Sequence, residues 1–396
     1  MDRAELGSRA LFPDLAAGAY LNHGGISPPS LPVRNAVTRV MEDYARLGTG
    51  AIHHRIEERE RLRGKLAGLI GAEQGSDIGF VQNTTRGATD VALCMPWRAG
   101  ERVLCMTGDF PANVTPWQCA AELFELDLTF LPQPTASTLD AWLETLAREL
   151  QRPTRLLAVS TVMFQSGLRL PTDRIGALCA AAGTELFVDA IQACGVVPVD
   201  VRRDGIDYLT CGGHKWMMGL EGAGFLYVAP KRVSRLEPRV AGWLGHEDAL
   251  AFLFLGPGHL RHDRPLLRRA SLVEGGAQSS VGYAALEAAL DLLQGAGIEK
   301  IHAHVNRYID ALEPELVARG FASERSADPA ARSGIFSVTP PRGIDVVALF
   351  RAIDPARVAL TIPDGRLRFA PHWPNHTDEI KTVLAAVDGA LAAVRK

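Results

Sequence analysis

The stretch "DGIDYLTCGGHKWMMGLEGAGFLYVAP", residues 204–230, holds a lysine in surroundings that lysines usually avoid. Lys215 follows two glycines and a histidine, and tryptophan and methionine residues come next. Apolar runs enter and leave the segment, so we expect Lys215 on a tight connection between two strands. A lysine removed from water has a lowered pKa, and its neutral amine forms Schiff bases with aldehydes. A surface lysine on a glycine turn is the alternative interpretation of this stretch alone.

Outward from this segment, β-branched runs alternate with alanine- and leucine-rich helical patterns between residues 65 and 230. The clearest predicted strands cover 102–106, 126–131, 155–160 and 185–189, and predicted helices cover 137–150 and 171–183. This alternation predicts an α/β domain with a mostly parallel sheet and helices on both faces. Ligands of such sheets bind at the carboxyl ends of the strands.

Composition limits the classes of function. The 396 residues suffice for two domains, and 47% hydrophobic with 22% charged residues is typical of a soluble globular protein. A net charge of −3 gives no basis for a nucleic-acid partner, and no apolar stretch is long enough to span a bilayer. The six cysteines are scattered without CxxC spacing, which favours reduced thiols over a metal site. We therefore expect a cytoplasmic protein without a metal.

The composition of the sequence changes after residue 230. Residues 231–270 are rich in Arg, Pro, Gly and Trp and predict an irregular excursion, and two long helical patterns, 280–297 and 298–320, follow. We predict a domain change near this point. The expected organisation is an N-terminal arm (1–30) that contributes to the active site, a large domain (31–280) and a small C-terminal domain (281–396).

Polar side chains stand at the ends of two predicted strands. Asp189 ends the buried strand 185–189, where a carboxylate needs a cationic partner such as a protonated pyridine nitrogen, and Gln192 could bond a ring oxygen. Thr84 and Thr85 follow another strand at the start of a helix, where free N–H groups attract phosphate. The alternatives are an ordinary loop cap at Asp189 and N-capping by Asn83 or Thr84.

These segments resemble the class V aminotransferase family, which uses pyridoxal 5′-phosphate (PLP). Residues 207–225 match its lysine signature, which has apolar residues, two small residues, His-Lys, a short spacer and Gly-x-Gly. Six further segments follow in the family's order, and they are 20–30, 81–92, 109–117, 160–170, 187–192 and 367–375. The first and last of these, with "LNHG" and "RFAPHWPN", look closer to the isopenicillin N epimerase-like branch than to the desulfurases.

The resemblance implies a fold-type-I PLP enzyme, with a mostly parallel sheet in the large domain and a smaller α+β C-terminal domain. Lys215 would bind PLP through a Schiff base, and Asp189 would keep the pyridine nitrogen protonated. The remaining implied roles are phosphate binding for Thr84, Thr85 and His214, ring stacking for Phe110, a contact with the phenolic oxygen for Gln192, a carboxylate clamp for Arg368, and the substrate side of the pocket for Asn22 and His23.

The family also suggests the reaction and the assembly. We expect chemistry at the α-carbon of an amino acid, as an epimerase or a β-eliminating C–S lyase ahead of an aminotransferase. Residues 358–369 lack the mobile cysteine of the desulfurases, and Arg86 adds positive charge beside the predicted phosphate turn. A homodimer with shared active sites is expected, although Ala277 stands where the family often supplies a threonine to the neighbouring phosphate.

Two other classes of function compete with this prediction. A protein that binds PLP without turnover is disfavoured because Lys215, Asp189 and Arg368 are all retained. A nicotinamide-dependent oxidoreductase is disfavoured because no GxGxxG follows an early strand.

Overall fold

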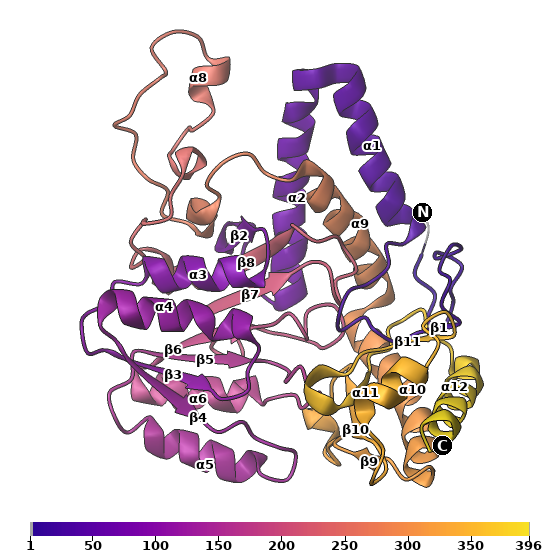
Figure 1. Ribbon diagram of the computed structural model, residues 1–396. Helices are drawn as coiled ribbons and strands as arrows, with labels where there is room; N and C mark the ends of the chain where they lie inside the picture. Colours follow the sequence, from indigo (N-terminus) through magenta and orange to yellow (C-terminus); the bar gives the residue numbers. More distant parts are fainter. Residues whose placement is uncertain (1–2, 396) are drawn as a thin grey trace.

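A seven-stranded sheet forms the centre of the structure, a computed structural model that describes residues 3–395 (Figure 1). Its order is β2-β8-β7-β6-β5-β3-β4. In that order the strands are β2 (Ile78–Val81), β8 (Gly224–Val228), β7 (Tyr208–Gly212), β6 (Glu185–Asp189), β5 (Leu156–Ser160), β3 (Arg102–Met106) and β4 (Asp127–Leu131). Strands β7, β6, β5, β3 and β4 are parallel, whereas β8 is antiparallel to both of its neighbours.

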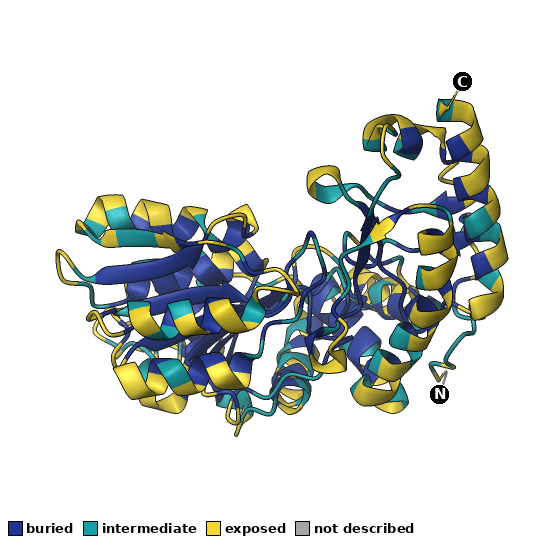
Figure 2. Cartoon of the chain, turned by 90° about the horizontal axis from the view of Figure 1, so that it is seen from below, coloured by how far each residue is buried: buried dark blue, intermediate teal, exposed yellow. Residues whose placement is uncertain are grey.

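Both faces of the sheet are covered by helices, as near-continuous apolar strands require. Along β5, Leu156 and Ala158 face α3 (Thr84–Cys94) and α4 (Thr115–Phe124). The alternate residues, such as Leu157, face the opposite layer, which contains α5 (Leu139–Glu149) and α6 (Thr172–Ala182). Figure 2 shows the strands in dark blue between helices whose outer sides are yellow.

The strands and helices agree closely with the patterns in the sequence. Predicted strands 102–106 and 185–189 have the bounds of β3 and β6, and the helix predicted over 171–183 forms as α6. Gly183 ends that helix in the left-handed region at φ 70°, which glycine adopts without steric cost. The predicted α/β architecture with a mostly parallel sheet is confirmed.

The C-terminal part contains a second, antiparallel sheet of three strands, β9 (Ala322–Ser323), β10 (Phe336–Thr339) and β12 (Leu367–Phe369). Helices α10 (Ile298–Ala318), α11 (Val346–Ala352) and α12 (Ile380–Val394) accompany it. The N-terminal arm joins this part through β1 (Ala19–Tyr20), which pairs in parallel with β11 (Val358–Ala359). This pairing directs the arm towards β12. The predicted domain limits at 30 and 280 remain predictions.

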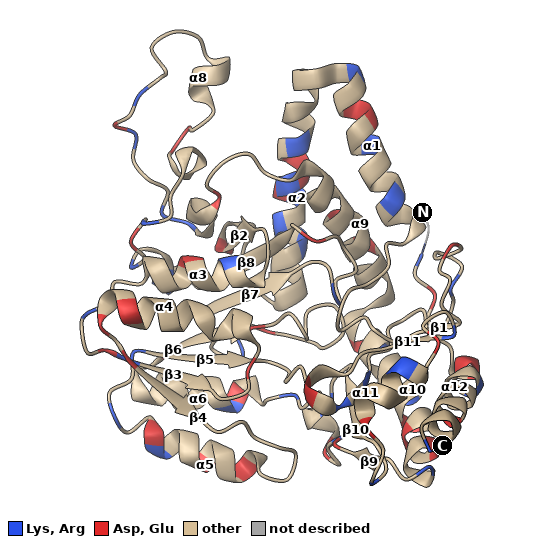
Figure 3. Cartoon of the chain, in the orientation of Figure 1, with Lys and Arg blue, Asp and Glu red and all other residues tan. Residues whose placement is uncertain are grey.

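Three long helices form a separate layer, α1 (Leu31–Leu47), α2 (Ile52–Ile70) and α9 (Ser280–Ala296) (Figure 1). The excursion over 231–270 extends from the sheet and contains only short helical turns, including α7 (Pro230–Val233) and α8 (Ala251–Phe254). Figure 3 shows Lys, Arg, Asp and Glu mainly on helices and loops, with both signs mixed along α2. Within residues 3–395 no helix combines the length and the apolar character that crossing a membrane requires.

Candidate active site

The strand register places the predicted residue Asp189 at the carboxyl edge of the parallel strands. Ser160 at the end of β5 pairs with Asp189 at the end of β6, and Asp189 pairs in turn with Thr210 of β7. A small cavity opens at these carboxyl ends, where α/β sheets bind ligands. Its lining consists of Phe110, Ser160, Val162, Phe164, Asp189, Ile191, Gln192 and Lys215.

Lys215 lies on a tightly bonded turn that follows β7. Gly213 N donates to Ala223 O at 2.8 Å, and Gly219 N donates back to Gly213 O at 2.9 Å. A Cβ atom on Gly213 would stand 2.8 Å from Ala223 O, closer than real Cβ atoms approach, so glycine is required there. Met218 adopts φ 58°, which shows how sharply the chain bends. The turn therefore holds the lysine backbone rigidly at the edge of the cavity.

Lys215 and Asp189 form a buried, electrostatically linked pair. Burial lowers the pKa of Lys215 to about 8, the Asp189 carboxylate opposes that change, and the positive charge of Arg368 adds to it. Burial raises the pKa of Asp189 to about 7. Asp189 Oδ1 accepts from Ile191 N at 2.9 Å, but the buried Oδ2 has no hydrogen-bond partner. Such an oxygen calls for a donor from a ligand, and a protonated pyridine nitrogen fits it.

Two further residues meet the requirements of a flat aromatic ligand. Phe110 is 41% exposed, contacts Phe164 edge-on with ring centroids 5.2 Å apart, and has Lys215 Nζ 5.4 Å from its own centroid. A ring that is exposed to this extent can accept offset stacking. Gln192 donates from Nε2 to Gly24 O at 3.0 Å, and its Oε1 accepts from Trp216. The second amide hydrogen of Gln192 is left for a ligand oxygen. The cavity residues therefore fit PLP.

The predicted phosphate residues surround the N-terminus of α3. Asn83 caps this helix by accepting from Arg86 N at 2.8 Å, as the capping alternative anticipates. Thr84 is buried, and its Oγ1 accepts from Gly212 N at 3.0 Å, while Thr85 is exposed at the same helix start. The helix start still presents N–H groups that suit a phosphate.

Two further residues with basic side chains, Arg86 and His214, belong to the predicted phosphate region. The Arg86 guanidinium lies 2.8 Å from Asp90 Oδ1, so its charge is already paired within α3. Burial lowers the pKa of His214, and the nearby Lys215 adds to that effect. A neutral His214 can donate one ring hydrogen to an anion.

Arg368 is buried and only partly satisfied. Its Nη1 donates to Phe164 O at 2.9 Å, its buried Nε has no hydrogen-bond partner, and burial lowers its pKa to about 10. A Cβ atom on Gly24 would stand 3.5 Å from the Arg368 Cζ, so the N-terminal arm passes directly over the guanidinium. An arginine with an unused planar N–H edge suits a carboxylate.

The structure separates the two predicted substrate residues of the arm. His23 is 2% exposed and lies behind the Lys215 turn, where Nδ1 is 2.7 Å from Ser27 Oγ, and it does not line the cavity. Ser27 bonds Nδ1 of the His23 ring, and the substrate contact expected for His23 stays a prediction. Asn22 bridges to Ala370, two residues after Arg368, and its buried Oδ1 has no hydrogen-bond partner.

Sequence reasoning assigned no role to a buried acid beneath Phe110. Asp109 Oδ1 accepts from Ser160 Oγ and from Phe110 N, both at 2.7 Å, and Oδ2 accepts from Asn113 at 3.0 Å. The segment 109–117 resembles the family, but the partner Ser160 lies at the end of β5, so this contact depends on the tertiary structure. Asp109 fixes the backbone that presents the aromatic ring.

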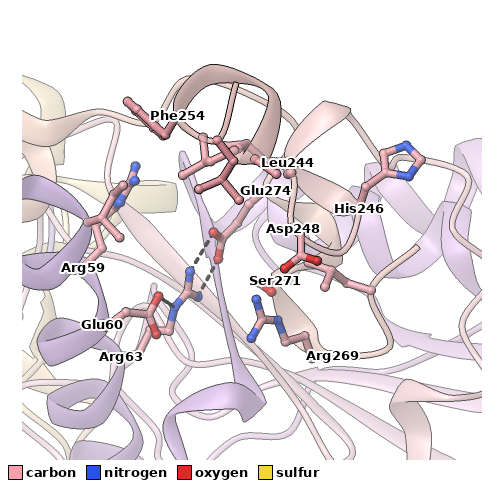
Figure 4. Close-up of a pocket in the computed structure, with 16 residues that line it drawn as sticks. Arg59, Glu60, Arg63, Leu244, His246, Asp248, Phe254, Arg269, Ser271 and Glu274 are labelled. Atoms are coloured by element: carbon pink, nitrogen blue, oxygen red, sulfur yellow. Dashed lines mark hydrogen bonds and ion pairs between the residues drawn. The ribbon is translucent and has the colours of Figure 1, made fainter. Parts of the chain in front are cut away.

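A larger groove, of about 470 Å³, lies away from this cavity between α2 and the excursion (Figure 4). It shares no lining residue with the cavity at Lys215. Its floor is an ion pair in which Arg63 Nη1 and Nη2 meet Glu274 at 2.5 and 2.7 Å. Across residues 3–395 no cluster of three or more His, Cys, Asp or Glu residues could hold a metal ion.

Comparisons with known proteins agree with the site. The aminotransferase class-V family model matches residues 20–362. An uncharacterized aminotransferase, YcbU of Bacillus subtilis, is 26% identical over 379 residues, covering 94% of each chain. A probable cysteine desulfurase of Methanothermobacter thermautotrophicus is 27% identical, covering 93% of this chain and 94% of its own. A structure of the cystine C–S lyase C-DES with its product cysteine persulfide has a TM-score of 0.84 at 24% identity, covering 95% of this chain and 98% of its own.

Fold and site together define a PLP-dependent enzyme of fold type I. The chain belongs to the class V aminotransferase family. The predicted family and cofactor are thus confirmed, whereas the isopenicillin N epimerase-like branch and the roles of single residues remain predictions.

Proposed function

We propose that this enzyme is a β-eliminating C–S lyase that removes a sulfur-linked group from the β-carbon of an α-amino acid. The observation that carries the proposal is a lysine base at a cavity whose lining contains no cysteine that could take up sulfur. Arg368 follows a segment, 358–367, without cysteine. Five of the six cysteines are buried, and the exposed one, Cys119, lies on α4 and does not line the cavity. The leaving sulfur must therefore depart with its own substituent.

When bound, PLP supplies an electron sink for the pair of electrons released at the α-carbon. Arg368 would bind the substrate carboxylate through its planar N–H edge and so orient the α-hydrogen. Lys215 Nζ would take up that proton, because a pKa near 8 leaves a useful fraction of neutral amine close to neutral pH. Asp189 Oδ2 would hold the pyridine N–H, and Phe110 would cover the ring face and exclude water.

The proposed reaction balances without an oxidant or reductant. The carbon–sulfur bond breaks, sulfur leaves as a thiol or persulfide with a proton, and one water converts the remaining three-carbon unit into pyruvate and ammonium. The two relatives named as a desulfurase and a cystine C–S lyase support sulfur chemistry on this fold. The relative named as an aminotransferase keeps amino transfer as the second candidate.

The test is to incubate the PLP-loaded enzyme in D₂O with cystine, cysteine S-conjugates, cysteine sulfoxides and amino acids without a β-leaving group. We expect pyruvate, ammonium and the released sulfur product in equal amounts from the sulfur compounds only, and that product is a persulfide from cystine, a thiol from S-conjugates and a sulfenic acid from sulfoxides. A keto acid that forms only with an amino acceptor would indicate amino transfer instead. Deuterium at the α-carbon with racemisation and no pyruvate would indicate epimerisation. Borohydride should fix PLP to Lys215, and Lys215→Ala should abolish turnover.

A further inference from the structure

Three consecutive carbonyl groups of the lysine turn accept hydrogen bonds from distant parts of the chain. Ser27 N donates to His214 O at 2.8 Å, and Ser27 Oγ donates to Lys215 O at 2.7 Å. The third carbonyl, Trp216 O, lies 2.9 Å from His372 Nε2. The lysine backbone is therefore held from outside the turn as well as by the turn's own hydrogen bonds.

The hydrogen-bond pattern fixes which ring nitrogens carry hydrogen. Because Ser27 gives its only hydroxyl hydrogen to Lys215 O, His23 Nδ1 must donate to Ser27 Oγ, 2.7 Å away. His372 Nδ1 accepts from Trp373 N at 2.7 Å, so His372 Nε2 carries the hydrogen that Trp216 O accepts. Burial lowers the pKa of both histidines, that of His372 to about 4, which keeps both neutral near pH 7.

The same network reaches the strand that carries Arg368. His23 N donates to Ala370 O at 3.1 Å, and Ala370 N donates to Leu21 O at 2.7 Å. The rings of His23 and His372 meet edge-on with centroids 5.2 Å apart. The N-terminal arm, the lysine turn and the segment after Arg368 are thus joined by hydrogen bonds into one unit.

We propose that Ser27, oriented by His23, is a positioning residue that holds the Lys215 backbone so that Nζ stays in the cavity between Asp189 and Phe110. The proposal rests on the role of Lys215 in the proposed function. Ser27 touches neither the cavity nor the reacting atoms and acts through the lysine carbonyl.

The expected consequence of losing this contact is a change in the surroundings of Nζ. The charged or titratable groups that act on Lys215 are Asp189 at the end of β6, Cys211 on β7 and Arg368 on β12, and Lys215 in turn lowers the pKa of the adjacent His214. Burial is the largest cause of the lowered pKa of Lys215. A lysine that is free to swing towards water regains hydration, so its pKa should rise towards its usual value.

The experiment compares Ser27→Ala, Ser27→Thr and a matched control, Thr184→Val, in the full-length chain. Thr184 is also a buried hydroxyl that donates to a backbone carbonyl, Thr154 O at 3.0 Å, but it precedes β6 and so lies at the far end of the strand from the site. Two quantities are measured. One is kcat with the best sulfur substrate, and the other is the pH midpoint of PLP uptake by protein freed of cofactor, followed by absorbance.

We expect Ser27→Ala to raise the pH midpoint of PLP uptake and to lower kcat about tenfold, because a misplaced Nζ takes up the α-proton less efficiently. Ser27→Thr, which keeps the hydroxyl, should restore both, and Thr184→Val should lower only the melting temperature. A Ser27→Ala protein with the wild-type midpoint and kcat would overturn the proposal, as would equal effects in Thr184→Val. If Ser27→Ala does not fold, His23→Phe, which removes the donor to Ser27, should shift the midpoint in the same direction, and an unchanged midpoint would overturn the proposal.

The same experiment separates this proposal from the proposed function. If borohydride does not fix PLP to Lys215 of the wild-type chain, the proposed function fails, and the proposed role of Ser27 fails as well. If PLP is fixed there but Ser27→Ala behaves as the wild type, the role of Ser27 fails and the proposed function stands.

Discussion

Thr84 Oγ1 accepts a hydrogen bond from Gly212 N at 3.0 Å, and this contact fastens the start of α3 to the end of β7. Thr84→Val keeps the shape of the side chain but leaves the buried N–H unpaired, so the free energy of unfolding should fall by about 1–3 kcal/mol. The exposed Thr85 is the matched control, because Thr85→Val should change stability by less than about 0.5 kcal/mol. Denaturant unfolding of the two cofactor-free variants measures the difference, and equal losses would contradict the assigned contact.

The lowered pKa of Lys215 predicts the pH dependence of PLP binding. Only the neutral amine reacts with the aldehyde, so the rate of PLP uptake should rise with pH through about 8, well below the usual lysine range. Asp189→Asn removes the charge that raises this pKa and should move the midpoint to lower pH. Arg368→Met removes a charge that lowers it and should move the midpoint to higher pH. Stopped-flow absorbance across pH 6–11 measures all three, and a wild-type midpoint above 10 would refute the buried lysine.

Lys215 and Asp189 could be predicted from the sequence because each depends on a local pattern. For Lys215 the pattern is a strand followed by a turn of small residues, and for Asp189 it is a strand that ends in a carboxylate. Which side a residue of the arm faces could not be predicted. The direction of the His23 ring depends on Ser27, and Ser27 in turn bonds a carbonyl 188 residues away, whereas the predicted substrate contact of His23 stays a prediction. Thr84 shows the same limit, since its partner Gly212 belongs to a strand that the chain reaches 128 residues later. Local patterns identify such residues, but only tertiary contacts orient them.

Arg368→Lys tests the predicted carboxylate clamp. A lysine keeps the charge but cannot present two parallel N–H groups, so kcat/KM for the best amino acid substrate should fall about 10- to 100-fold. Steady-state kinetics with that substrate and with its analogue lacking the carboxylate provide the test. The variant should lose most of the wild-type preference for the carboxylate. An unchanged preference would show that Arg368 does not contact the carboxylate.

We propose that the excursion over 231–270 forms part of a homodimer interface, because apolar side chains gather on it without cover. The exposed ones are Trp243, Phe252, Leu253, Phe254, Leu255 and Leu260. Leu255→Asp, at a residue 64% exposed, should convert a dimer into monomers, since a charge in an apolar interface is costly. Leu123→Asp, at a residue 62% exposed on α4, should leave the assembly unchanged. Light scattering after size exclusion measures both, and a wild-type monomer would disprove the interface.

The buried pair of Arg63 and Glu274 ties the segment just after the excursion to α2, and losing it should lower the stability more than losing an exposed ion pair of this region (Figure 4). Glu274 Oε1 also accepts from Phe80 N at 2.9 Å, so Glu274→Ala removes the buried carboxylate partner of the Arg63 guanidinium and leaves a buried N–H of β2 unpaired. The free energy of unfolding should fall by about 3–5 kcal/mol. Glu60 also meets Arg63, at 3.0 Å, but its side chain is 64% exposed, so Glu60→Ala should cost less than about 1 kcal/mol. Urea unfolding of the two variants compares a buried partner with an exposed partner of the same arginine. Similar losses would mean that water reaches the Glu274 carboxylate.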